Sequence, residues 1–128
     1  MRIAIIDYGA GNTQSVKYAL KRLGCKGILT YDKEVISNSD KIIFPGVGQA
    51  SSAMKKLKSK GLDVLIPNLK QPVLGICLGM QLMCNFSEEG NTDCLKIFDS
   101  NVKRFDDSSK VPQMGWNTVF DLNTSLFD

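Results

Sequence analysis

Residues 73–81 read VLGICLGMQ, and no other part of the chain says as much about its architecture. An apolar run leads into the spacing Gly-x-Cys-x-Gly, which is typical of a nucleophile elbow, a sharp turn from a strand into a helix. Gly75 and Gly79 lack a Cβ, so the strand and the helix can close around the turn. Cys77 would point outward at the start of the helix, where the positive end of the helix dipole favours an anion. The pattern predicts a cysteine nucleophile, and the alternative is a buried structural cysteine.

The composition is that of a globular protein. The chain has 128 residues, of which 43% are hydrophobic and 23% charged, so we expect one domain over residues 1–128. The net charge is +3, and the one dense lysine cluster, at 55–60, contains no aromatic residue. That cluster indicates a solvated helix face rather than a nucleic-acid site. No apolar run approaches the ~20 residues of a membrane span, so we expect no membrane association.

The cysteines indicate a reduced protein. They stand at 25, 77, 84 and 94, no two of them are spaced Cys-x-x-Cys, and the chain has no histidine to complete a zinc site. We therefore expect no metal, no cofactor and a cytoplasmic location. The missing histidine also bears on catalysis, because a cysteine nucleophile usually needs a neighbouring base.

Apolar runs alternate with segments of helical periodicity. This alternation predicts an α/β fold, an open and mostly parallel sheet with helices on both faces, as in flavodoxin-like proteins. We expect strands at 2–7, 27–31, 41–44 and 73–76, helices at 16–23, 50–61 and 62–69, and a polar connection at 32–40. A further helix should begin at Cys77, with Met80, Leu82, Met83 and Phe86 on its apolar face. Beyond residue 90, turn residues punctuate short segments around 95–105 and 115–122, which we expect to be antiparallel strands.

Three glycine-rich loops, at 8–12, 45–49 and 77–81, follow the predicted strands. Ligands of open α/β sheets bind beyond the carboxyl ends of the strands, so these loops are the predicted site. The first loop is an incomplete dinucleotide fingerprint, because Gln14 occupies the position of its third glycine.

The second loop reads Pro-Gly-Val-Gly over 45–48 and can present backbone N–H groups to a developing oxyanion. The N–H of Leu78, directly after the cysteine, would be the second donor. Gln81 lies one helical turn after Cys77, where it can hold an amide substrate or simply face solvent. The segment 111–117, which contains the only tryptophan, is either a core plug or an exposed anchor for a partner.

Four segments together resemble the class I glutamine amidotransferases, and more narrowly the glutaminase subunits of imidazole glycerol phosphate synthases. The elbow is shared by the whole class, whereas Met80 within it is more typical of the glutaminase subunits of imidazole glycerol phosphate synthases. The more specific segments are 7–12 with 15–20, 45–48 and 111–117, and the resemblance runs from residue 1 to about residue 120.

The resemblance implies a reaction and roles for residues. Cys77 would attack the side-chain amide of glutamine to form a glutamyl thioester, ammonia would leave, and water would release glutamate. The amides of Val47 and Leu78 would form the oxyanion hole. Gly46 and Gly48 would contact the substrate in a loop that reorients for activity, and Gln81 would contact the bound glutamine.

The resemblance also implies a partner. Asn12, Met114 and Trp116 match positions that face a cyclase subunit with a (β/α)8 barrel, so the expected assembly is a heterodimer. Ammonia would pass through that barrel and be built into imidazole glycerol phosphate, a step of histidine biosynthesis. The family usually has a histidine where this chain has Gln113, a position that is not the catalytic base.

A larger departure concerns the catalytic His and Glu of the family, which have no counterpart here. We therefore expect residues 1–128 to be the N-terminal two thirds of the domain, to be inactive alone and to self-associate through an uncovered edge or face. Two alternatives stay open. The chain could be a non-catalytic remnant that binds the cyclase, or an amidotransferase subunit that serves another acceptor synthase.

Overall fold

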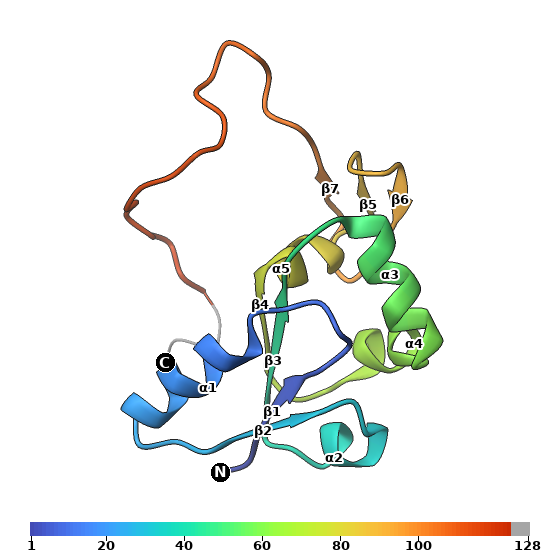
Figure 1. Ribbon diagram of the computed structural model, residues 1–128, viewed down its shortest axis with the longest axis vertical. Coiled ribbons are helices and arrows are strands. Elements are labelled where there is room, and N and C mark those ends of the chain that lie inside the picture. The colour runs from blue at the N-terminus through green and yellow to red at the C-terminus, as the bar shows by residue number, and fades with distance from the viewer. Residues whose placement is uncertain (124–128) are drawn as a thin grey trace.

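The computed structural model describes residues 1–123 of the chain. Helices and short strands alternate along most of it (Figure 1). In order, they are β1 (Ile3–Ile6), α1 (Thr13–Arg22), β2 (Gly27–Thr30), α2 (Lys33–Ser37), β3 (Lys41–Gly46), α3 (Ala50–Ser59), α4 (Leu62–Leu65), the 3-10 helix η1 (Ile66–Asn68), β4 (Val73–Cys77), α5 (Leu78–Leu82), β5 (Phe86–Ser87), β6 (Thr92–Asp93) and β7 (Asn101–Val102).

The first four strands form one parallel sheet in the order β2-β1-β3-β4. Central β1 pairs Ile5 with Leu29 on one side and with Ile43 on the other. Helix α1 lies on one side of this sheet, and α2, α3 and α4 lie on the other (Figure 1). The predicted α/β architecture, with helices on both faces of a parallel sheet, is therefore confirmed.

Alternation along β1 explains the two faces. Successive strand side chains point to opposite sides, so Ala4 and Ile6 enter the larger core beneath α3 and α4, while Ile3 and Ile5 pack with Leu20 of α1. All four β1 side chains are buried. Burial of each large aliphatic side chain stabilises the fold by about 1.5–3 kcal/mol, so β1 contributes to the stability of both layers.

A helix that the sequence did not predict interrupts the connection at 32–40. The Asp32 carboxylate accepts hydrogen bonds from the backbone N–H groups of Glu34 and Val35, at 2.8 and 3.0 Å, and so caps α2. Only Ile36 of this helix is buried. One buried residue gives no helical periodicity, and so the polar pattern suggested a loop.

The helix after the elbow is shorter than expected. Helix α5 ends at Leu82, Met80 is 51% exposed, and Phe86 lies in β5, so the predicted apolar face is wrong for these two residues. Backbone N–H groups of the returning chain explain the ending. That of Leu95 donates to Leu82, and that of Ile97 donates to Met83, both at 2.9 Å.

The segment beyond α5 also differs from expectation. Strands β5, β6 and β7 form a small sheet in which β5–β6 is antiparallel and β5–β7 is parallel. Strands β5 and β6 lie outside the two segments predicted as strands, and the predicted antiparallel pairing is wrong for β7. Residues 101–102 are the part of 95–105 that forms a strand. The expected strand over 115–122 is wrong: these residues pair with nothing within 1–123, and all are exposed. Without a neighbouring ladder to satisfy its backbone, a short segment between turn residues does not become a strand.

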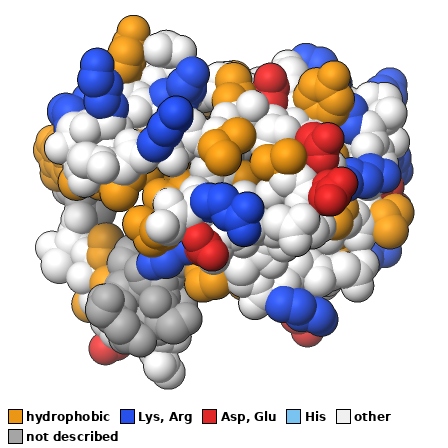
Figure 2. All heavy atoms as spheres, turned by 90° about the horizontal axis from the view of Figure 1, so that it is seen from below, with side chains coloured by type: hydrophobic (Ala, Val, Ile, Leu, Met, Phe, Trp, Pro, Cys, Tyr) orange, Lys and Arg blue, Asp and Glu red, His pale blue; other side chains and the backbone are white. Residues whose placement is uncertain are grey.

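The surface agrees with the modest net charge. Figure 2 shows basic side chains dispersed over the face seen from below, with acidic and apolar side chains between them. No helix within residues 1–123 has the length and apolar character needed to cross a membrane.

Candidate functional site

Cys77 occupies the turn between β4 and α5. Its φ of 55° and ψ of −120° lie outside the regions that non-glycine residues ordinarily adopt. Its side chain is exposed, and the residue forms the N-cap position of α5. A strained backbone that holds a reactive side chain outward is the geometry of a nucleophile elbow, and the predicted turn is therefore present.

The two glycines of the elbow have no room for a side chain. A Cβ on Gly79 would collide with the carbonyl oxygen of Phe44, and a Cβ on Gly75 would lie 2.7 Å from the Cα of Met80. Both contacts are with backbone, which cannot move aside cheaply. The sequence spacing thus reflects two close backbone approaches, as expected for a strand and a helix that close around Cys77.

The Gly46–Gly48 loop begins beside the nucleophile. Gly46 is the last residue of β3 and pairs in register with Cys77, so the strand extends further than the predicted 41–44. Beyond it, Val47 is 50% exposed and Gly48 has a φ of +94° with open space around its Cα. The ladder therefore holds one end of this loop at the elbow, and its exposed part has room to change conformation.

A cavity of about 390 Å³ opens beside Gln81, the residue one turn into α5. Cys77 itself does not line this cavity. The cavity is lined by acidic, basic and uncharged side chains. They are Glu88 and Glu89, Lys103 and Arg104, and Gln81, Ser87 and Val102. A ligand with both an ammonium and a carboxylate group matches such a lining.

Backbone contacts hold the two carboxylates of this cavity. The Glu89 side chain accepts a hydrogen bond of 2.9 Å from the N–H of Ala50, the first residue of α3. The Glu88 side chain accepts one of 2.8 Å from the N–H of Arg104. Sequence analysis missed this cavity because β5 and β7, which bring its residues together, are separated along the chain. The adjacent acidic residues after Ser87 were the available signal.

Tyr8 is a second residue that sequence analysis missed. Its side chain is 1% exposed and its ring lies 5.5 Å from that of Phe44. Burial raises the pKa of the Tyr8 hydroxyl well above its ordinary value, and the nearby charge of Cys77 adds to the rise. A tyrosine in a glycine loop carries no sequence signal for this placement.

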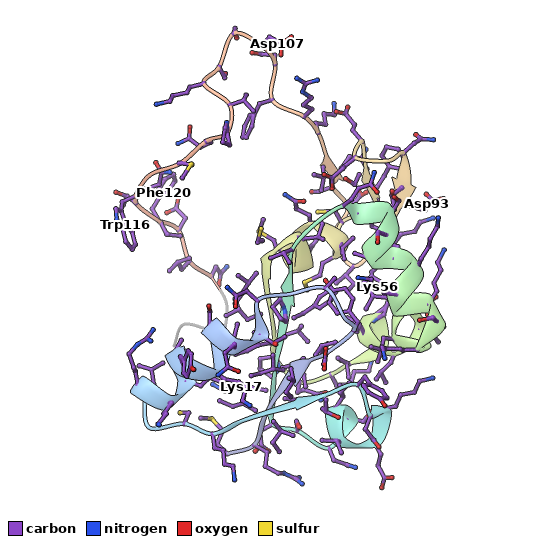
Figure 3. All side chains as sticks on the ribbon, in the orientation of Figure 1. Lys17, Lys56, Asp93, Asp107, Trp116 and Phe120 are labelled. Atoms are coloured by element: carbon purple, nitrogen blue, oxygen red, sulfur yellow. The ribbon has the colours of Figure 1, made fainter. Side chains whose placement is uncertain are left out.

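The loop at 8–12 is held to its neighbours by polar contacts. The ammonium of Lys56, on α3, donates a hydrogen bond of 2.8 Å to the carbonyl of Gly9 (Figure 3). The side chain of Asn12 accepts one of 3.2 Å from the N–H of Ser15 and caps α1. Asn12 is therefore exposed and also has a structural role as the cap of α1.

Trp116 lies on the extended segment that follows β7, away from the elbow (Figure 3), and Met114 precedes it by two residues on the same segment. Met114 is 84% exposed and Trp116 is fully exposed, so within residues 1–123 neither belongs to a core plug. The exposed alternative for this segment is the one the structure supports. The structure does not bring these two side chains to Cys77.

The residues of the site provide a thiol, backbone donors and fixed charges rather than metal ligands. Within residues 1–123, no three side chains of the metal-binding types gather in one place. The four cysteines are free thiols, and Cys77 is the exposed one among them. Nucleophilic acyl chemistry is the reaction type that this arrangement can support.

Comparison with known proteins agrees with this geometry. The family model "Glutamine amidotransferase class-I" matches residues 4–128. A crystal structure of a glutamine amidotransferase shares the fold, with a TM-score of 0.65 and 19% identity over 77% of this chain and 54% of that one. The chain therefore belongs to the class-I glutamine amidotransferases.

Three relatives within this class bear the name imidazole glycerol phosphate synthase subunit HisH. The protein of that name from Bacteroides thetaiotaomicron is 58% identical over all of this chain and 67% of its own length. Those from Bacteroides fragilis and Haemophilus influenzae are 60% and 50% identical, with 66% and 65% of their lengths covered. The chain spans about two thirds of the length of these relatives.

Proposed function

We propose that this chain belongs to the glutaminase subunit of an imidazole glycerol phosphate synthase, which hydrolyses glutamine to glutamate and ammonia. The observation that carries the proposal is the Cys77 elbow, with its positive φ, beside the last residue of β3. The names of the relatives support the particular synthase. The elbow supports the chemistry independently of those names.

The proposed reaction is acyl transfer through a thioester. The Cys77 sulfur attacks the side-chain amide carbon of glutamine, and the carbonyl electrons move to its oxygen. The N–H groups of Val47 and Leu78 stabilise that oxyanion, an interaction that strengthens as the charge develops. Its collapse breaks the carbon–nitrogen bond and releases ammonia once the nitrogen has been protonated. Water then cleaves the thioester, which yields glutamate and regenerates the thiol.

The charged cavity beside Gln81 supplies recognition of the amino acid. We assign the Glu89 carboxylate to the α-ammonium of glutamine and the cations of Lys103 and Arg104 to its α-carboxylate. Gln81, with Gly46 and Gly48 across the elbow, orients the side-chain amide. The hydrogen bond from Ala50 to Glu89 supports this assignment, because it fixes one wall of the cavity before the substrate arrives.

The sequence contains no histidine, the usual base for a cysteine nucleophile. Thiol attack and protonation of the leaving nitrogen both require a proton carrier. We therefore propose that the chain alone binds glutamine but does not turn it over usefully. The same observation favours a second candidate function, a non-catalytic protein that binds the cyclase. A different acceptor synthase remains the alternative partner.

Partner binding is assigned to Asn12, Met114 and Trp116, whose exposure supports the proposal. The partner is a cyclase subunit with a (β/α)8 barrel, which receives the ammonia in a cytoplasmic heterodimer. The free cysteines support a reducing compartment. Trp116→Ala should weaken the complex at least tenfold without changing the stability of the chain, because exposed tryptophans are frequent hot spots. Equal affinity of Trp116→Ala and wild type for the cyclase would remove Trp116 from the interface.

A two-part assay tests the function. The purified chain is incubated with glutamine while glutamate is measured, and separately with a glutamine-like diazoketone while the mass of the Cys77 peptide is followed. We expect no glutamate, but a covalent adduct on Cys77 that free glutamine suppresses. Turnover that disappears in Cys77→Ala would contradict the missing base. A failure of glutamine to protect Cys77 would contradict glutamine binding and favour the non-catalytic candidate.

A further inference from the structure

Tyr8 carries an unusual hydroxyl group. Among residues 1–123 it is the buried side-chain polar group that lacks a hydrogen-bond partner. The side chain is 1% exposed and belongs to the main core cluster. A buried hydroxyl without a hydrogen-bond partner is destabilising relative to a phenylalanine of the same shape. A second conformation of the protein in which the hydroxyl has a partner would explain its presence.

The hydroxyl lies close to both halves of the proposed oxyanion site. A Cβ on Gly46 would lie 2.7 Å from the Tyr8 oxygen and 2.5 Å from the backbone nitrogen of Gly79. The same Cβ would be 2.9 Å from the Cβ of Leu78. The position of the missing Cβ of Gly46 is therefore within contact distance of both the Tyr8 oxygen and the elbow.

Two properties allow this hydroxyl to donate a hydrogen bond when the loop changes conformation. Its raised pKa keeps it protonated throughout the neutral range, so it can donate a hydrogen bond at working pH. In addition, the main chain near the hydroxyl is held up to residue 46 and has room to move after it. The β3–β4 ladder holds Phe44, Pro45 and the Cα of Gly46. The peptide that joins Gly46 to Val47 leads into the open part of the loop, where Val47 is half exposed and Gly48 has open space around it.

We propose that Tyr8 is a positioning residue, whose hydroxyl donates a hydrogen bond to a main-chain carbonyl of residues 46–48 when that loop binds the substrate oxyanion. The N–H and C=O of a trans peptide point in opposite directions. When the N–H of Val47 turns outward to the substrate, the carbonyl of Gly46 turns inward, to the side on which Tyr8 lies. The inference rests on the proposed function, because it assigns Val47 to the oxyanion hole.

The test compares wild type with Tyr8→Phe, using L-glutamate γ-semialdehyde as the probe. The Cys77 sulfur adds to the aldehyde carbon, the carbonyl electrons move to oxygen, and the thiol proton ends on that oxygen, so a hemithioacetal forms without any leaving group. Protection of Cys77 from iodoacetamide, followed by mass spectrometry of its peptide, gives an apparent Kd of the probe, whose open aldehyde is in equilibrium with its cyclic imine in water. Because both proteins are measured in the same probe solution, the ratio of their Kd values is unaffected by this equilibrium. We expect a Kd about five- to tenfold higher in Tyr8→Phe, the loss expected for one hydrogen bond.

Two measurements separate positioning from a general structural effect. The alkylation rate of Cys77 without aldehyde should be the same in both proteins, and the urea midpoint of Tyr8→Phe should not fall below that of wild type. Tyr31→Phe, which removes an exposed hydroxyl from a side chain that contacts Lys60, is the matched control and should leave all three values unchanged.

Each result has a distinct meaning. An equal aldehyde Kd in wild type and Tyr8→Phe would overturn the role of Tyr8 and leave the proposed function standing. A parallel change of Kd and alkylation rate would show that Tyr8 only supports the fold, which also overturns the inference. A wild-type chain that does not bind the aldehyde would refute the proposed function, and the role of Tyr8 with it.

Discussion

Gly46 and Cys77 are neighbours across a parallel ladder, each the last residue of its strand. This pairing fixes the start of the donor loop against the nucleophile through backbone hydrogen bonds, without help from any side chain. It also explains why position 46 is a glycine, because a Cβ there would lie 2.5 Å from the nitrogen of Gly79. The elbow and the start of the loop therefore form one rigid junction, and substitutions at it should affect stability as well as chemistry.

Gly79→Ala should be severely destabilising. The added Cβ would collide with the backbone carbonyl of Phe44 in β3, and neither strand nor helix can yield without breaking the junction. We expect a loss of about 3 kcal/mol or more in the free energy of unfolding, the upper range for overpacking, measured by urea titration. Gly24→Ala is the control. It has open space around it and a φ of +71°, so strain alone should cost about 1–2 kcal/mol. Equal losses in the two variants would contradict the close approach.

The cysteines should differ in their rates of alkylation. Cys77 is exposed, whereas Cys94 is 7% exposed and the pKa of its thiol is raised by burial, with smaller contributions from the charges of Cys84 and Asp93. Iodoacetamide should therefore modify Cys77 first, and Cys94 only when the chain unfolds. Mass spectrometry of the peptides over time, with Cys77→Ala as the reference, measures the order. Modification of Cys94 at the rate of Cys77 in native buffer would contradict the burial.

Stability should fall at high pH in a way that depends on Tyr8. The ordinary pKa of this group is 10.0, and burial raises it in the folded protein, with the charge of Cys77 adding to the effect. Above pH 10 the unfolded chain loses this proton while the folded chain keeps it. The stabilisation is therefore complete below pH 10 and declines above it, by up to about 1.4 kcal/mol per pH unit. Urea titrations between pH 8 and 11.5 should show a shallower decline in Tyr8→Phe. Identical slopes would indicate that Tyr8 ionises normally.

Two substitutions of Glu89 should distinguish its contribution to ligand binding from its contribution to the stability of the fold. Glu89→Ala removes the acceptor for the N–H of Ala50 at the start of α3 and should cost about 1–2 kcal/mol. Glu89→Gln keeps an acceptor oxygen and loses only the charge, so its cost should be about 0.5 kcal/mol. Both variants should bind L-glutamate γ-semialdehyde more weakly, because the partner of the ammonium group is gone. Wild-type affinity in Glu89→Gln would assign the ammonium to a different group.

The parts of the fold that were predictable from the sequence have strong local patterns. The buried run of β1, the periodic spacing in α1 and α3, and the glycines around Cys77 each specify their element through residues close together in the chain. The errors fall where local pattern is weak. Helix α2 buries one residue, and 115–122 lies between turn residues as a short strand would but has no neighbouring ladder within residues 1–123.

The candidate site divides in the same way. Cys77, the glycine loop and Gln81 could be found from the sequence, because strained turns and close backbone approaches demand glycine at fixed spacings. Those positions also carried the resemblance to the amidotransferases that the comparisons confirm. Glu89, the charged cavity and Tyr8 emerged only from the folded chain. Their positions depend on the pairing of β5 with β7 and on the packing of Tyr8 against Phe44, contacts between residues far apart in sequence that no local spacing encodes.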